Sequence, residues 1–247
     1  MTRGARTALF LVAAAMLGPL LWNAFHDIPA FGHIQHLYRD LAVRASLAQS
    51  TANVVSSINF DLRALDTLGE ESIFVASVTG VMILLRPDAQ ERRYRPPASG
   101  AVLEAVRLVG YLMLPVTLAL GAETVAHGHL TPGGGFQGGV VLATGLHVLY
   151  VSGTYQALDR LRPIGSLDVG EAVGAAAFSG MGIAGLAVGG GFLTNLLPKG
   201  SLGNLFSAGT VPLLNVAVGF EIGCGMVVLL AQFLAQEITI AKKGRPE

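Results

Sequence analysis

The chain has 247 residues, of which 52% are hydrophobic and 13% are charged, whereas a soluble domain carries roughly 25% charged residues. Its 16 basic and 16 acidic residues balance, and no basic run interleaved with aromatic residues is present, which excludes a nucleic-acid-binding protein of the usual kind. Apolar runs of about 20 residues, enough to cross a hydrocarbon core of about 30 Å, predict an all-α, polytopic membrane helix bundle.

Six apolar segments are expected to span the membrane. They are residues 7–25, 68–85, 101–122, 135–153, 169–196 and 207–232. The first could instead be a signal peptide, because Arg3 and Arg6 precede its apolar run. Residues 26–50 are expected to form a polar connection. Residues 47–60 hold too many polar groups for a lipid-facing span, so they predict an interfacial or re-entrant helix.

The second span begins with a pattern typical of a capping box. Thr67 can cap the helix N-terminus, while Glu70, three residues later, can reach back to the Thr67 backbone N–H. The Arg86-Pro87 pair is expected to end the span. These signals predict a helix that starts at about Thr67.

Residues 86–100 are charged and contain prolines, so they form the predicted domain boundary. Residues 1–95 would carry two spans and residues 96–247 four. With the N-terminus in the cytoplasm, eleven of the 16 Lys and Arg residues fall in inner segments, four in outer segments and one within the third span. This bias predicts a multi-pass protein of the cell inner (plasma) membrane with cytoplasmic N- and C-termini.

Pairs of glycines four residues apart recur in the later spans and put two glycines on one helix face. The pairs are Gly170/Gly174, Gly185/Gly189 and Gly219/Gly223. Such faces let helices approach closely in a membrane. We expect some of them to meet partner subunits.

Glu221 lies near the centre of the last span, flanked by apolar residues. A carboxylate at the bilayer centre costs about 2.5–3.5 kcal/mol even on insertion scales, so it indicates a function. Glu221 can load and release a proton or a cation. Alternatively, it can be a neutral glutamic acid that is hydrogen-bonded to a partner helix. Both interpretations stay open.

Other acidic residues lie near helix ends. Glu104 and Glu171 fall at cytoplasmic ends and Glu123 just past the outer end of the third span, where solvated charges are common. Four more acids precede or begin the second span: Asp61, Asp66, Glu70 and Glu71. They fit either helix capping with a salt bridge or the mouth of an ion path.

The most unusual segment opens the fourth span and contains Pro132, Gly133, Gly134, Gly135 and Phe136. Free N–H groups at a helix start can hold an anion or carboxylate, or the glycines can let backbones pack. His127 and His129 precede this segment, but two histidines without a third ligand are weak evidence for a metal. We therefore predict no metal site and no cofactor. No GxSxG, HExxH or P-loop motif is present, so we expect no enzyme.

The run HLTPGGGFQGG, residues 129–139, resembles the signature of the B subunit of Mrp-type Na+/H+ antiporters. The four spans within residues 101–235 fit the size of that B subunit. Residues 53–70, with NVV and DLRALDTLGE, resemble the C-terminal end of the A subunit, and also the equivalent E subunit of membrane-bound hydrogenases. The chain therefore resembles an A-subunit tail fused to a B subunit.

The resemblance implies roles for particular residues. The acid of the family's DTLGE pattern falls on Glu70, and its aspartate positions fall on Asp61 and Asp66. The family's aspartate in the last B-subunit span is replaced here by Glu221, and Leu130 stands where the family usually has asparagine.

It also implies the partners, which are other antiporter subunits homologous to complex I membrane subunits, the lipid bilayer, and Na+ and H+ as transported ions. We therefore expect a non-enzymatic antiporter subunit that contributes to the ion path and to assembly. The ion-path candidates are Glu221, Glu70, Asp66, Asp61, Glu123, His129 and Glu171. The alternatives are a membrane subunit of a hydrogenase-type or related redox-driven complex, or a purely structural membrane adaptor.

Overall fold

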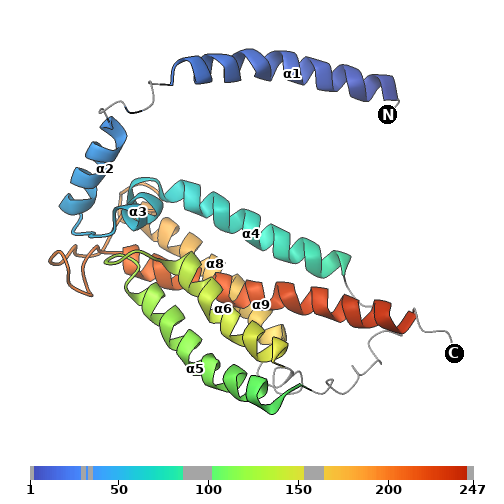
Figure 1. Cartoon of the computed structure of the whole chain (residues 1–247). Helices are drawn as coiled ribbons and strands as arrows, with labels where there is room; N and C mark the ends of the chain where they lie inside the picture. Colours follow the sequence, from blue (N-terminus) through green and yellow to red (C-terminus); the bar gives the residue numbers. More distant parts are fainter. Residues whose placement is uncertain (1–2, 29–31, 33–35, 86–101, 153–163, 244–247) are drawn as a thin grey trace. The chain divides into compact units, whose positions relative to one another are not determined.

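A computed structural model describes residues 3–28, 32, 36–85, 102–152 and 164–243, and this part of the chain is all-helical (Figure 1). Its helices are α1 (Arg3–His26), α2 (Leu37–Ala48), α3 (Val54–Ser57), the π-helix η1 (Ile58–Leu62), α4 (Ala64–Leu84), α5 (Glu104–Ala126), α6 (Gly135–Val151), α8 (Ile164–Ala187) and α9 (Val211–Lys243). The chain divides into two compact units, Met1–Asp40 and Leu41–Glu247.

Five of these helices are long and apolar enough to cross a membrane, namely α1, α4, α5, α8 and α9, and α6 is a shorter apolar helix. The prediction of an all-α bundle with about six spans is therefore confirmed. The predicted domain boundary at residues 86–100 lies outside the described residues, so it stays a prediction, as does the sidedness.

Helix α9 forms the core of the larger unit, where it packs against α4, α6 and α8 (Figure 1). In its apolar window 61% of the residues are buried, against 17% in α4 and 11% in α5. The buried cluster around it comprises Phe60, Ala64, Phe178, Leu193, Ala208, Val211, Leu214, Ala217, Val218 and Ile222. The outer helices α4 and α5 thus leave broad apolar faces for lipid or for other subunits.

The predicted capping box at Thr67 is wrong. Helix α4 already begins at Ala64, and Arg63 at its N-cap makes no capping hydrogen bond through its side chain. The Thr67 hydroxyl instead donates to the backbone carbonyl of Asn59 at 2.7 Å. The reason is the π-helix η1 immediately before α4, whose wide turn leaves this carbonyl open to a side-chain donor.

Two predictions for residues 26–60 need correction. The predicted polar connection contains helix α2, which buries Ala42 and Ser46, four residues apart on one helical face. The predicted helix at 47–60 is shorter than expected, since the chain turns after α2 and regular structure resumes only in α3 and η1. Ser50 explains the break, because its φ of 56° lies in the left-handed region that an α-helix cannot include.

Helix α8 ends at Ala187, nine residues before the predicted end at 196. The chain then folds back. The Phe192 ring packs where a side chain at Gly182 would otherwise lie, and Leu193 is buried. A continuous apolar composition concealed this turn, because turn residues 188–196 are as apolar as the helix before them.

Two of the three predicted glycine faces are confirmed as close-packing surfaces, but within this chain. Gly170 and Gly174 of α8 lie against α9, and Gly219 of α9 lies against α5 and α6. The prediction for the third pair is wrong. Gly189 lies beyond the end of α8 at a φ of 81°, so it forms no helix face with Gly185.

Candidate functional site

Asn53 connects the segment before α3 to the loop between α5 and α6, residues 127–134, which we call the glycine-rich loop. Its Oδ1 caps α3 by accepting the backbone N–H groups of Val55 at 3.1 Å and Ser56 at 3.4 Å. Its Nδ2 donates to three loop carbonyls, those of Gly128 at 2.7 Å, Thr131 at 2.8 Å and Gly133 at 3.4 Å. One asparagine side chain therefore provides hydrogen-bond partners both for N–H groups at the start of α3 and for carbonyl groups of the glycine-rich loop.

Replacing Asn53 by aspartate is expected to loosen the glycine-rich loop. Aspartate keeps the oxygen that caps α3, but it loses every donor and points a carboxylate at three carbonyls. A lost hydrogen bond with an unsatisfied partner costs about 1–3 kcal/mol, so thermal unfolding of the purified complex should shift to lower temperature and amide exchange in residues 127–134 should accelerate.

Asn204→Asp is the matched control. The Asn204 Oδ1 also accepts a backbone N–H, from Phe206 at 3.3 Å, in an exposed turn. Its change to aspartate keeps that bond and should leave stability near the wild-type value. Equal stability of Asn53→Asp and wild type would contradict the role given to Asn53.

Asn215 on α9 is the second polar junction, and the sequence analysis did not identify it. It is fully buried, its Oδ1 accepts the Gly135 N–H at 2.8 Å, and its Nδ2 donates to Ser56 Oγ at 3.1 Å and to the Val211 carbonyl at 3.0 Å. The first N–H of α6 is thus satisfied by the protein. A buried asparagine in an apolar span is the signal that could have revealed this site.

Three buried acids from three helices come together: Glu71 of α4, Glu171 of α8 and Glu221 of α9. They are 3%, 4% and 0% exposed, and we call them the acid cluster. The carboxyl groups of Glu71 and Glu221 are close enough to interact with each other, and the charge of Glu171 also acts on Glu221. The sequence pattern places Glu71 only among the acids of a helix entry, because spacing cannot tell which of two adjacent acids faces the core.

Four of the six carboxyl oxygens in the acid cluster are buried without a hydrogen-bond donor among the described residues. Among the described residues, no well-aligned donor reaches either carboxyl oxygen of Glu221, Oε2 of Glu71 or Oε1 of Glu171. Two facing carboxyl groups form a hydrogen bond only when one of them carries a proton. The Glu71–Glu221 pair can therefore hold a proton between α4 and α9, and Glu171 offers a next position for it.

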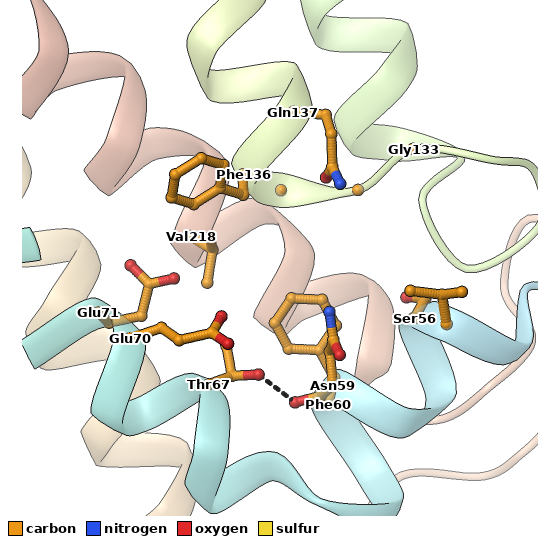
Figure 2. Close-up of a pocket in the computed structure, with 13 residues that line it drawn as sticks. Ser56, Asn59, Phe60, Thr67, Glu70, Glu71, Gly133, Phe136, Gln137 and Val218 are labelled. Carbon is orange, nitrogen blue, oxygen red and sulfur yellow. Dashed lines mark hydrogen bonds between the residues drawn. The ribbon is translucent and has the colours of Figure 1, made fainter. Parts of the chain in front are cut away.

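A cavity of about 230 Å³ lies between α3, η1, α4 and the start of α6 (Figure 2). Figure 2 shows Glu70 and Glu71 on α4 and Phe136 and Gln137 on α6, on opposite sides of this space. Glu71 lines the cavity and also contacts Glu221, so it joins the cavity to the acid cluster. Glu70 is an exposed residue whose side chain also lines the cavity.

The remaining candidates from the sequence lie apart from the acid cluster. Asp66 is exposed and forms an ion pair with Arg63. Glu123 is exposed and lies 3.3 Å from His127, a pair that is ionic only when the histidine is protonated. Both fit solvated helix-end charges, which contribute about 0–1 kcal/mol.

Asp61 and His129 lie near the loop that connects α8 and α9. Burial raises the pKa of Asp61, opposed by the nearby Lys199 ammonium and the Asn195 amide. Burial also lowers the pKa of Lys199, which Asp61 partly offsets. The His129 ring is fully buried, and burial lowers its pKa despite the neighbouring backbone carbonyls of Asn204 and Leu205.

The described residues contain no group of three or more His, Cys, Asp or Glu side chains that could hold a metal ion. Cys224 is a free, buried thiol on α9. The acid cluster, with Glu71 also lining the cavity, has an arrangement suited to proton exchange between carboxyl groups.

Comparisons with known proteins give a family and a fold. Residues 105–228 match the family described as a domain related to the MnhB subunit of Na+/H+ antiporter. An uncharacterised protein of Methanocaldococcus jannaschii is 29% identical over 220 residues, which are 79% of this chain and 82% of that protein. A Rhizobium meliloti protein, named as the probable A/B subunit of a K+/H+ antiporter, is 31% identical over 206 residues, 74% of this chain.

Two solved structures share the fold. A chain of the membrane-bound sulfane sulfur reductase, an archaeal respiratory membrane complex, has a TM-score of 0.71 and 26% identity, covering 93% of this chain and 98% of that chain. A chain of the Mrp complex from Dietzia sp. has a TM-score of 0.65 and 23% identity, covering 94% of this chain. This chain spans 20% of the Rhizobium protein and 26% of the Dietzia chain.

Proposed function

Because the chain belongs to the family of domains related to the MnhB subunit of Na+/H+ antiporters, we propose that it is a non-enzymatic subunit of a cation/proton antiporter of the Mrp type. In this proposal it assembles in the cell inner membrane, with cytoplasmic termini, beside subunits homologous to complex I membrane subunits. Its own contribution is a segment of the ion path formed by Glu71, Glu221 and Glu171.

The observation that carries this proposal is the acid cluster. Three carboxyl groups buried between the helices of a membrane bundle are costly to keep out of water, and no protein donor in the described residues offsets that cost for Glu221. A structural adaptor needs no such groups, since its helices can pack through glycine faces alone. Proton loading and release gives the cluster a reason to be retained.

A second candidate is the membrane arm of a redox-driven ion-pumping complex. The observation that favours it is the similarity over 98% of the chain from the sulfane sulfur reductase complex. The acid cluster would serve the same purpose there, so the two candidates differ in what drives the ions and not in what this chain does.

Transport in membrane vesicles tests both candidates. Everted vesicles from cells that express the complete complex should exchange Na+ or K+ for protons under an imposed pH gradient, and vesicles without this chain should not. If exchange requires an added electron donor, the redox-driven candidate is correct. Unchanged exchange after removal of this chain would reject both.

A further inference from the structure

We propose that the cavity between η1, α4 and the glycine-rich loop binds one partly dehydrated alkali cation, Na+ or K+, in direct contact with Glu71. This inference deepens the proposed function by assigning a binding site and a ligand class. It rests on the lining of the cavity, the unsatisfied oxygen of Glu71 and the absence of lining cations among the described residues.

Six of the thirteen residues that line the cavity have side chains with oxygen atoms, and three more are the glycines 133–135, which expose only backbone. The six oxygen-bearing side chains are Ser56, Asn59, Thr67, Glu70, Glu71 and Gln137. Hard cations bind carboxylate, amide, hydroxyl and backbone carbonyl oxygens, and they do not need the histidine or cysteine groups that a transition metal prefers. A volume of about 230 Å³ holds an ion with several of its waters, since a water occupies about 30 Å³.

Glu71 is the strongest single piece of evidence. Its side chain is 3% exposed, it lines the cavity, and its Oε2 has no hydrogen-bond partner in the described part of the chain. A buried carboxylate oxygen without a donor is costly unless a cation or a proton meets it. The Thr67 hydroxyl lines the same cavity and is held in place by its hydrogen bond to the Asn59 carbonyl.

Charge favours a cation over an anion. The ionisable residues that line the cavity are Glu70 and Glu71, both acidic. The positive end of the α6 helix dipole lies at its N-terminus and would favour an anion. This effect contributes only about 0.3–1 kcal/mol, and the Gly135 N–H already donates to Asn215. Two carboxylates close to the site outweigh this effect.

Proton and cation occupancy should compete, because only an ionised Glu71 attracts the cation. The acids that face Glu71 are Glu70 on its own helix and Glu221 on α9, with Glu171 on α8 behind Glu221. A cation entering the cavity would favour transfer of the shared proton from Glu71 to Glu221. The same carboxyl group thereby links cation binding in the cavity to proton movement in the acid cluster.

Equilibrium binding of radioactive Na+ to the purified complex tests the site, with choline chloride to keep ionic strength constant and radioactive Rb+ as the probe for the K+ alternative. Glu71→Gln should reduce the number of bound ions by one per complex, and the matched Glu104→Gln, at an exposed residue of α5 outside the cavity, should not. The affinity for the cavity ion should rise with pH by at most about tenfold per unit, as expected when one proton is displaced.

Gln137→Leu provides a second variant in case Glu71→Gln fails to assemble. It removes one lining oxygen on α6 and leaves all acids intact, so it should weaken binding of the cavity ion about tenfold at unchanged assembly. An unchanged ion count in assembled Glu71→Gln, or binding without pH dependence, would overturn the cavity proposal.

Glu221→Gln separates this inference from the proposed function. That variant lies outside the cavity lining, so it should keep the bound cation even though it blocks proton movement. Loss of transport in Glu221→Gln without any bound alkali cation in the wild type would sustain the proposed function and reject the cavity site.

Discussion

Replacing Glu221 by glutamine is expected to stop ion exchange while the complex still assembles. Glutamine has nearly the same shape and can hydrogen-bond to Glu71, but it cannot release a proton. Because proton transfer by a positioned group typically contributes at least about 100-fold to a rate, exchange in everted vesicles should fall to the background of vesicles without the complex. Dequenching of a pH-sensitive dye after addition of Na+ or K+ measures this rate.

Glu104→Gln is the matched control, since it makes the same chemical change at an exposed residue in the first turn of α5. It should transport at the wild-type rate. Blue-native electrophoresis of both variants shows whether the subunits remain together. Wild-type exchange by an assembled Glu221→Gln complex would remove the acid cluster from the mechanism and leave the structural adaptor as the better interpretation.

Replacing Gly139 of α6 by alanine is expected to destabilise the bundle. A Cβ atom there would lie 2.8 Å from the Gly219 carbonyl and 3.0 Å from the Gly223 backbone nitrogen, both on α9. These are rigid backbone atoms, so the two helices must separate. Overpacking of this kind costs about 1–3 kcal/mol, and less of the chain should be recovered in the assembled complex, with a lower unfolding temperature.

Gly180→Ala is the control for the change in residue type. A Cβ atom at Gly180, in the interior of α8, meets nothing within 4 Å. Alanine is favoured over glycine in a helix by up to about 1 kcal/mol, so this variant should be as stable as wild type or slightly more stable. If both alanine variants behave alike, close contact between α6 and α9 is not what holds the bundle together.

The long apolar helices were predictable from the sequence because a membrane span imposes a strong compositional constraint over about 20 residues. The residues at which these helices begin and end were harder to predict. The end of α8 was missed because residues 188–196 are apolar while a glycine and a leucine with positive φ turn the chain back. The start of α4 was missed because the π-helix η1 supplies a carbonyl to Thr67 that no spacing rule anticipates.

The site was predictable in part for a similar reason. Glu221 was identifiable because an acid at the centre of an apolar run is rare. Adjacent acids were harder, since Glu70 and Glu71 differ by about 100° around the helix and only the packing of α4 on α9 shows which is buried. Asn215 was missed because its partners, Ser56 and Gly135, are distant in sequence.

The central position of α9 has a consequence for biogenesis. It follows the other described helices in the chain, so a ribosome makes α4, α5, α6 and α8 before the helix on which α4, α6 and α8 pack. Until α9 is inserted, Glu71 and Glu171 face no completed interior, and membrane quality-control proteases can reach a loosely packed intermediate. Chains truncated before α9 should therefore be degraded rapidly instead of accumulating as stable fragments.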